Sequence, residues 1–376
     1  MKIAINCAFY QPKGGGIKEY IDNLINNFAI LNPDYEIVLY VLKDYLNYAK
    51  SNLPDKYKIK TIPYKSGSRY NKIKRSICEN SFWRKEEKEE KFDIFHSPFF
   101  HAPKLKHAKV LLTVHDLRLY RFPKTYEFFR YQFLKRKVKH SIRRADKIIS
   151  ISEFTKNEII ELCGVFPDKI KVIPEAINKD RFSDKYLFEP QDLPEILKSK
   201  PFLLSVGHME PRKNYDRLIE AFKLLKNDPA FKDLLLVIVG KKDHSYTETL
   251  NLIQETPDVY YLDFVSGNSL LWLYKNAKLF VFPSYYEGFG FPPLEAAALG
   301  TISAVSNASS IPEVCGNYAL YFNPYDVEEM GKMISKPLKD NELLSSMKEK
   351  INTWLDNFSW KKNACETLEV YKQLEK

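Results

Sequence analysis

The sequence predicts an α/β protein with two doubly wound domains, and three observations support this prediction. The chain has 376 residues, which at roughly 150 residues per domain corresponds to two domains. Short, continuously apolar runs alternate with amphipathic helical patterns in both halves, as is typical of parallel sheets covered on both faces. The alternation stops at 186–200, a polar stretch with Pro190 and Pro194 that we expect to be a linker. The expected domains are therefore 1–185 and 201–359.

The first half contains short apolar runs that predict strands. They are expected at Ile3–Ala8, Glu36–Leu42, Asp93–Ser97, Val110–His115 and Lys147–Ile151. Helical patterns lie between or after them, at Ile17–Leu31, Lys124–Lys147 and Glu153–Leu162. In the helix expected at 124–147, apolar residues recur at steps of three and four from Tyr131 to Ala145. This spacing predicts one apolar stripe on that helix.

The second half repeats the same order of elements. Strands are expected at Phe202–Val206, Leu234–Val239, Val259–Leu262, Leu279–Phe282 and Ile302–Val305. Helices are expected at Tyr215–Leu225, Tyr246–Glu255, Ser269–Lys275, Pro293–Leu299 and Val327–Ile334. The tail, 360–376, predicts one more amphipathic helix.

The composition excludes several classes of protein. With 44% hydrophobic and 28% charged residues, the chain can bury a large core and is not globally disordered. No apolar run approaches the roughly 18 residues of a membrane-spanning helix, and the first residues show no secretion signal, so we expect a cytoplasmic protein. The five cysteines are widely spaced and form no CxxC motif, which argues against a disulfide framework and a zinc site.

The net charge of +10 is distributed unevenly. Residues 1–185 carry 37 basic and 22 acidic side chains, a net +15, whereas residues 186–376 carry a net −5. This asymmetry indicates an anionic partner for the first half: nucleic acid, a phosphorylated small molecule or an anionic membrane surface. The basic helix at 124–147 has two interpretations that the sequence leaves open. It is either a core-packing helix with a solvated basic face or a helix that docks on a membrane.

In paired open α/β domains, ligands bind at the carboxyl ends of the strands, so we expect the site in a cleft between the domains. Two loops at strand ends could bind phosphate. The first, Pro12–Gly16, has three consecutive glycines before a helix, which allow close approach of a ligand to backbone amides. A glycine turn that only reverses the chain fits this loop equally well. The second, Val206–Asn214, places Arg212 and Lys213 at a helix entry, where two cations could clamp a diphosphate.

A third loop, Glu287–Gly300, contains two carboxylates and is the most specific of the three. Glu287 lies before a helix whose start is marked by adjacent prolines, and Glu295 falls in its first turn. A carboxylate accepts two hydroxyl hydrogen bonds side by side, so each glutamate suits the vicinal hydroxyls of a sugar or a ribose. A purely structural turn would need neither carboxylate.

These loops resemble those of the retaining glycosyltransferases of family 4, which have the glycosyltransferase-B fold of two Rossmann-like domains facing across a cleft. The resemblance covers nearly the whole chain in the family's order, and the two-glutamate loop is its most specific element. The other matching segments are Gly14–Ile17, TVHDL (Thr113–Leu117), SISEFTK (Ser150–Lys156), EPRKN (Glu210–Asn214), SSIPEV (Ser309–Val314) and FSWKKNACETLEVY (Phe358–Tyr371).

The resemblance implies roles for the second domain, which would bind a nucleotide-sugar donor. Glu295 would bind the ribose hydroxyls and Glu287 the hydroxyls of the transferred sugar, while Arg212 and Lys213 would clamp the diphosphate. Backbone amides would assist at Gly15, Gly16, Gly288, Phe289 and Gly290.

The first domain would bind the acceptor, with the closing helix packing back on it. His115 corresponds to the family's histidine that faces the donor sugar, and Asp116 and Ser152 are acceptor-side candidates. Two positions depart from the family's pattern: His208 replaces a frequent arginine, and Asp263 replaces a glycine near the expected base. One phosphate contact and the identity of the base are therefore open.

The resemblance also implies a mechanism and a substrate class. Arg212, Lys213 and helix amides would stabilise the leaving diphosphate without a metal, and the sequence contains no Asp-x-Asp motif. We therefore expect no metal and no cofactor. SSIPEV and EPRKN resemble the bacterial mannosyltransferase branch, which implies GDP-mannose as donor and a lipid-linked glycan acceptor in surface polysaccharide synthesis, such as lipopolysaccharide. The basic helix at 124–147, with Phe128, Phe129 and Phe133, would then lie on an anionic membrane surface as a peripheral contact.

Other functions remain open at this point. The donor could be a UDP-sugar. Outside the transferases, a nucleotide-sugar epimerase would need acid–base groups for which no motif is found, and a silent scaffold would not need Glu287, Glu295 and Lys213. An RNA-binding protein would explain the basic half, but no recognisable RNA module is present and we expect no nucleic acid partner.

Overall fold

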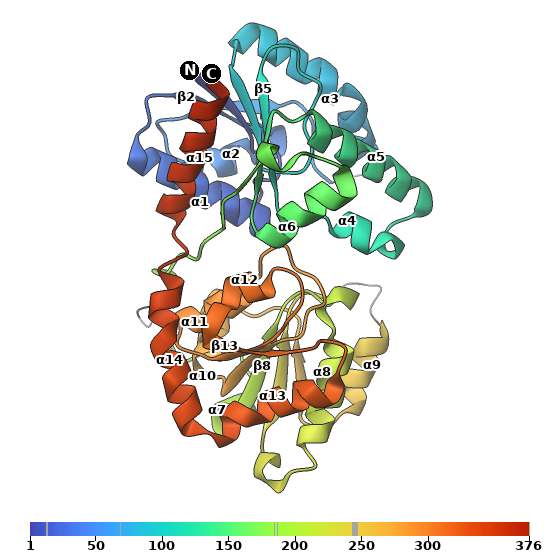
Figure 1. The fold of residues 1–376 in the computed structure, drawn as a ribbon, viewed down its shortest axis with the longest axis vertical. Helices are drawn as coiled ribbons and strands as arrows, with labels where there is room; N and C mark the ends of the chain where they lie inside the picture. Colours follow the sequence, from blue (N-terminus) through green and yellow to red (C-terminus); the bar gives the residue numbers. More distant parts are fainter. Residues whose placement is uncertain (13, 68, 184, 186, 243–246, 376) are drawn as a thin grey trace. The chain divides into compact units, whose positions relative to one another are not determined.

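The computed structural model describes the chain except residues 13, 68, 184, 186, 243–246 and 376. The chain divides into two compact units (Figure 1). Unit 1 contains Met1–Ala176 and Ser359–Lys376, and unit 2 contains Ile177–Phe358. Four residues at or within the predicted segments, Lys13, Tyr186, Tyr246 and Lys376, lie outside the described residues.

Unit 1 is built on a parallel sheet, in which seven strands are described in the order β3-β2-β1-β4-β5-β6-β7. The strands are β1 (Lys2–Asn6), β2 (Glu36–Leu42), β3 (Lys58–Ile62), β4 (Ile94–Ser97), β5 (Lys109–Val114), β6 (Lys147–Ser150) and β7 (Ile170–Val172). The sequence did not predict β3 and β7, the two edge strands. β3 alternates lysine with apolar residues and β7 has three residues, so neither shows the continuous apolar run of a central strand.

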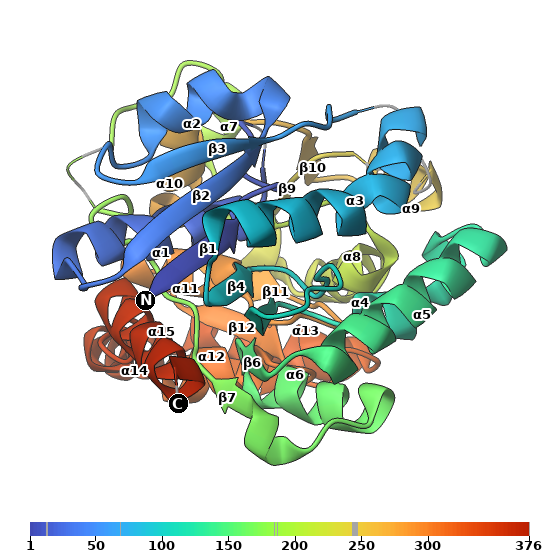
Figure 2. The same cartoon turned by 90° about the horizontal axis from the view of Figure 1, so that it is seen from above.

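Helices cover both faces of this sheet (Figure 2). Their bounds are α1 (Gly16–Leu31), α2 (Leu46–Asn52), α3 (Arg69–Glu90), α4 (Arg118–Arg121), α5 (Phe128–Arg144), α6 (Glu153–Glu158), which continues as a π-helix over Ile159–Cys163, and α15 (Trp360–Glu375). On one face α15 packs beside α1, where the ring of Tyr371 lies 5.9 Å from that of Phe28. On the other face Trp83 of α3 packs on Tyr40 and Phe95, and α5 adds Val138 to the same core.

The basic helix is shorter than the predicted 124–147, because α5 begins at Phe128 and ends at Arg144. Pro123 starts a separate 3-10 turn, and Glu127 and Ala145 have extended ψ angles of 139° and 138°. The predicted apolar stripe is present, since Val138, Ile142 and Ala145 are buried.

Unit 2 is built on a second parallel sheet, in which six strands are described in the order β10-β9-β8-β11-β12-β13. The strands are β8 (Phe202–Val206), β9 (Leu235–Val239), β10 (Val259–Leu262), β11 (Leu279–Phe282), β12 (Ser303–Ser306) and β13 (Ala319–Phe322). The helices are α7 (Glu195–Ser199), α8 (Tyr215–Leu225), α9 (Thr247–Glu255), α10 (Gly267–Asn276), α11 (Phe291–Ala298), α12 (Ile311–Cys315), α13 (Val327–Lys339) and α14 (Asn341–Leu355). α13 packs against α8, and α14 packs against α11.

The stretch 186–200, which we expected to be a linker, belongs to unit 2, which starts earlier, at Ile177. Its polar side chains are anchored on α10. The backbone N–H of Phe188 donates to Asn268 Oδ1 at 3.1 Å, and Asp192 accepts a hydrogen bond from Ser269. Polar anchoring of this kind leaves no periodic apolar pattern, which explains why the sequence suggested a break.

No helix in the described part of the chain combines the length and the apolar character needed to cross a membrane.

Candidate active site

The most constrained polar cluster of unit 2 lies where the strand order of its sheet reverses. β8 and β11 are adjacent and parallel although β9 and β10 intervene in the sequence. The loops that follow β8 and β11 therefore leave the same edge of the sheet side by side. In open α/β sheets this switch point is the usual ligand-binding crevice.

The loop after β8 is held in one conformation by its neighbours. A Cβ atom at Gly207 would lie 2.8 Å from Lys213 Cε, so only glycine leaves room for the lysine side chain. Asn214, at φ 60°, donates from Nδ2 to the carbonyl oxygens of Pro283 at 3.1 Å and Pro324 at 2.8 Å. These bonds join the loops after β8, β11 and β13 into one rigid edge.

Glu287, Arg212 and Lys213 meet at this edge. Arg212 Nη1 donates to Glu287 Oε2 at 2.6 Å, and Lys213 Nζ lies 2.7 Å from Glu287 Oε1. All three side chains are largely buried, with 15%, 6% and 12% of Arg212, Lys213 and Glu287 exposed. Glu210, which the sequence analysis missed, accepts from Arg212 Nε at 2.7 Å. Two cations and two carboxylates thus balance in charge within one buried cluster.

Burial and mutual charge shift the protonation equilibria of this cluster. Burial alone would raise the pKa of Glu287, but the charges of Arg212 and Lys213 outweigh it and the pKa falls below its usual value. Burial lowers the pKa of Lys213, and Glu287 opposes that shift only in part. The carboxylate is therefore ionised at neutral pH, which keeps both cations fixed at the strand ends.

The two-glutamate loop is positioned from behind by two serines that the sequence analysis quoted only as part of SSIPEV. Ser309 Oγ accepts from the backbone N–H of Glu287 at 3.0 Å. Ser310 Oγ lies 2.9 Å from the carbonyl oxygen of Glu287 and 2.8 Å from that of Phe289. Gly290, at φ 118°, turns the chain into α11. The hydrogen bonds of Ser309 and Ser310 therefore hold the turn of Gly288, Phe289 and Gly290 in one conformation.

Glu295 lies in the second turn of α11 and not in the first as predicted, because the helix already begins at Phe291. Tyr274 of α10 donates its hydroxyl proton to Glu295 Oε2 at 2.7 Å. Burial and the Glu295 charge raise the pKa of Tyr274, so it remains a donor at all ordinary pH values. This bond orients one carboxylate oxygen.

The candidates of the first half lie in unit 1, at the carboxyl ends of its strands. His115 follows β5, with Nδ1 3.0 Å from Glu175 Oε1 and Nε2 3.2 Å from the carbonyl oxygen of Pro98. Burial lowers the pKa of His115, but the hydrogen bond and charge of Glu175 outweigh it, and the net shift is upward. Because both ring nitrogens face oxygen acceptors, the imidazolium form is favoured. Glu175, which follows β7, was not predicted.

Asp116 and Ser152 have local structural partners. Asp116 Oδ1 accepts from the backbone N–H of Arg118 at 3.0 Å, beside the start of α4. Ser152 is buried and caps α6, accepting from the backbone N–H of Thr155 at 3.1 Å. The capping role accounts for this serine, so its role toward an acceptor stays a prediction.

The glycine loop that precedes α1 is only partly constrained by packing. A Cβ at Gly14 would lie 2.4 Å from Lys18 Cβ, whereas a Cβ at Gly15 would meet nothing within 4 Å. Gly15 is the N-cap of α1 and Gly16 its first residue. Their amides lie at a helix start, as expected, and of Gly14 and Gly15 only Gly14 is required sterically.

Family models for glycosyltransferases match both halves of the chain. Residues 14–181 match the model described as "Glycosyltransferase Family 4", and residues 190–354 match "Glycosyl transferases group 1". The chain is a glycosyltransferase with a family 4 domain and a group 1 domain. The silent-scaffold interpretation and the RNA-binding interpretation of the basic half lose their support, and the Arg212–Glu287–Lys213 cluster is the candidate active site of a glycosyltransferase.

Curated relatives of this glycosyltransferase include two from Escherichia coli. It is 29% identical to O-antigen chain mannosyltransferase B over 287 residues, which are 75% of this chain and 74% of the relative. It is 31% identical to the serotype-specific mannosyltransferase WbdA over 237 residues, which are 61% of this chain and 29% of the relative. The glycosyltransferase thus spans most of the first relative and under a third of the second.

Solved structures share its fold. Anabaena Alr3699/HepE, in a structure titled as a complex with UDP-glucose, is 15% identical to this glycosyltransferase, with a TM-score of 0.73 over 99% of this chain and 100% of the other. The likeness confirms the predicted fold class of two Rossmann-like domains, the glycosyltransferase-B fold.

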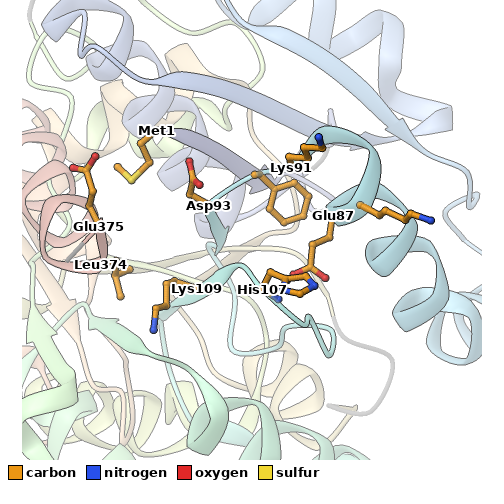
Figure 3. A pocket seen from close by; sticks show the side chains of 10 residues that line it. Met1, Glu87, Lys91, Asp93, His107, Lys109, Leu374 and Glu375 are labelled. Carbon is orange, nitrogen blue, oxygen red and sulfur yellow. The ribbon is translucent and has the colours of Figure 1, made fainter.

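Two further observations on the structure, on metal-ligating groups and on a surface hollow, do not point to a binding site. Within the described residues, no group of three or more His, Cys, Asp or Glu side chains is arranged to hold a metal ion, and metal independence stays a prediction. A hollow of about 740 Å³ lies at the opposite edge of the unit 1 sheet, where β1, β4 and β5 begin (Figure 3). Glu87 is the one buried carboxylate among its lining residues, and it accepts hydrogen bonds from the backbone N–H groups of residues 106–108.

Proposed function

We propose that this glycosyltransferase transfers a mannosyl group from GDP-mannose to a growing, lipid-linked glycan, with retention of configuration and without a metal. The observation that carries the proposal is the buried Arg212–Glu287–Lys213 cluster at the switch point of the unit 2 sheet. The mannosyl group is supported by two relatives named as mannosyltransferases, and a nucleotide-sugar donor by the UDP-glucose complex of HepE.

The cluster suits the separation of charge in this reaction. Cleavage of the bond to the nucleoside diphosphate places negative charge on the departing phosphate. Arg212 and Lys213 are fixed cations with the geometry to accept that charge, and their burial strengthens the interaction. In the structure both are paired with Glu287. Donor binding would therefore exchange partners: the diphosphate would take the cations, and Glu287 would take sugar hydroxyls.

The other candidates would hold the remaining parts of the substrates. Glu295, oriented by Tyr274, would accept the ribose hydroxyls. The His115 imidazolium would donate to hydroxyls of the donor sugar or the acceptor. Asp116 and Ser152 would act on the acceptor side only through the loop that they order.

Retention and metal independence are supported by the chemistry of the residues present. The chain has no Asp-x-Asp sequence, the usual metal–diphosphate motif, and Arg and Lys can supply the positive charge instead. No residue is assigned as a covalent nucleophile, so the acceptor would attack from the face of the leaving group. The proposal also places the reaction at the cytoplasmic face of a membrane, where a lipid-linked acceptor would be found.

The test is transfer from GDP-mannose, with UDP- and ADP-sugars as competitors, measured with and without EDTA. We expect GDP-mannose to be used, the product to carry the α-anomeric coupling in its NMR spectrum, and Glu287→Gln to remove transfer. The control is Glu220→Gln, an exposed carboxylate on α8. Transfer from a UDP-sugar alone would overturn the donor, an inverted anomer would overturn retention, and loss of transfer in EDTA would overturn metal independence.

A further inference from the structure

Three phenylalanines near the start of α5 are exposed on one helix. Phe128, Phe129 and Phe133 have 68%, 86% and 55% of their surface accessible. The rings of Phe128 and Phe129 lie 5.6 Å apart, edge to face. Single exposed apolar residues need no explanation, but three within six residues of one helix form a patch of the kind that marks an interaction surface.

Cations share the outward face of α5 with these rings. At about 100° per residue, the buried Val138, Ser141 and Ile142 define the inward side. The opposite side carries Phe129 and Phe133 and, further along, Arg136 and His140, with Phe128 and Lys139 on its flank. Arg143 is tied instead to the carbonyl oxygen of Cys163, at 2.6 Å. The sequence of α5 contains no acidic residue between Phe128 and Arg144. We call this side the outward face of α5.

Not every cation of α5 belongs to this face. Lys137 lies 3.1 Å from the carboxylate of Glu79, and Arg144 Nη2 is 3.3 Å from the carbonyl oxygens of both Ala102 and Pro103. These two side chains hold α5 to the rest of unit 1. In the described part of the chain, no hydrogen bond or ion pair ties Arg130, Arg136 or Lys139 to another element. Arg130, whose guanidinium lies 5.9 Å from the centre of the Tyr126 ring, follows Phe129 in the first turn. These three are the cations best placed to meet a partner.

The start of α5 lies at the functional edge of unit 1. β5 ends at Val114, next to His115, and α4 and α5 lead from there to the beginning of β6. The first turns of α5 are therefore on the same edge of the sheet as His115. Figure 2 shows this end of α5 projecting beyond the sheet and helices of unit 1.

We infer that the outward face of α5 docks on an anionic lipid bilayer. The phenylalanines would enter the boundary between headgroups and acyl chains, and Arg130, Arg136 and Lys139 would meet the lipid phosphates. Exposed rings at the projecting end of a helix can insert into a bilayer. A single-stranded nucleic acid would instead need aromatic platforms within a groove. This inference names the surface by which the enzyme would reach the membrane that carries its lipid-linked acceptor. It rests on the proposed function only for the reason why the protein would dock there.

The test is partition of the full chain, without substrates, onto vesicles of phosphatidylcholine with and without 40 mol% phosphatidylglycerol (roughly the range of anionic leaflets). We expect binding to the anionic vesicles that weakens with salt. Phe128→Ser/Phe129→Ser/Phe133→Ser should reduce partition at least about tenfold. Arg130→Gln/Arg136→Gln/Lys139→Gln should reduce it by roughly 100-fold at low salt.

Matched controls distinguish binding through this face from nonspecific hydrophobic and electrostatic binding elsewhere on the surface. Phe166→Ser/Phe188→Ser/Phe264→Ser removes equally exposed rings elsewhere, and Lys50→Gln/Lys88→Gln/Lys348→Gln removes equally exposed charge. Both controls should partition like the wild type, and all variants should melt like it. Equal losses in a test variant and its control would overturn the inference.

An RNA arm tests the other class of partner. Salt-sensitive binding of single-stranded RNA that the cation variant removes, with no partition onto vesicles, would assign this face to nucleic acid and overturn docking on a bilayer. Because the vesicle assay needs no turnover, its result is independent of the donor. Docking without transfer from GDP-mannose would contradict only the proposed function, and transfer without docking would contradict only this inference.

Discussion

Glu175 is the residue that sets the charge of His115. Its carboxylate is almost fully buried, with 2% exposed, and lies 3.0 Å from the imidazole. A buried carboxylate beside histidine favours the imidazolium. This pair gives unit 1 a buried ion pair next to its strand ends, balanced in charge like the unit 2 cluster.

We predict that Glu175→Gln lowers the pKa of His115, measured by NMR titration of its ring protons. A histidine whose folded pKa is raised stabilises the fold fully below its unfolded pKa, about 6.5. That stability is lost as pH rises through the folded value. The wild type should therefore exceed Glu175→Gln in stability most at pH 5.5 and progressively less above pH 6.5. Glu153→Gln, which removes an exposed carboxylate, is the control. An unchanged His115 titration in Glu175→Gln would contradict this assignment.

At the scale of elements, the two glycine loops differ in how strictly they need glycine. Gly207 faces the Lys213 side chain at contact distance, while Gly15 faces open space. We predict that Gly207→Ala displaces Lys213 and lowers kcat/KM by roughly 100-fold, the effect of an ångström-scale misplacement, whereas Gly15→Ala stays within about twofold. Steady-state kinetics of the two variants provides the measurement. Comparable losses in both would show that Gly207 is not required to position Lys213.

The elements that the sequence predicted well are those whose apolar pattern matches their burial. β2, β8, β10, β11 and α8 have the predicted bounds. α3 was missed, and the side chains described from Cys78 to Glu90 explain why: Trp83 is buried in the core, but its sequence neighbours on the C-terminal side are almost all charged. The carboxylate of Glu86 accepts from Tyr40 and Lys60 instead of facing solvent. Residues that are buried through specific hydrogen bonds and ion pairs leave no periodic apolar pattern in the sequence.

The site was predictable only as far as strand ends could be located. Arg212 and Glu287 follow strands that prove adjacent, so both were correctly placed at the carboxyl edge. Their pairing spans 75 residues of sequence and depends on the strand order, which the motifs did not specify. Glu175 was missed for the same reason, since folding brings it to His115 across 60 residues of sequence. Glu210 lies only two residues from its partner Arg212, but no motif marked it as a site residue.

At the scale of the whole molecule, the two glycosyltransferase domains and the strand order of their sheets support one account. Unit 2 would bind the donor through a preformed, charge-balanced cluster. Unit 1 would supply His115 and, through the outward face of α5, contact with a bilayer. That the two units enclose donor and acceptor in a common cleft stays a prediction.

The central claim is that Arg212 and Lys213 bind the donor diphosphate. The most direct measurement is thermal unfolding with GDP, in EDTA, of the wild type and of Lys213→Met. Lys223→Met, which changes an exposed lysine of α8, is the control. GDP at 100 times its dissociation constant should stabilise the wild type and the control by about 2.7 kcal/mol. Lys213→Met should fold and show little or no stabilisation. Equal stabilisation of all three proteins would contradict the account, because the nucleotide would then bind elsewhere.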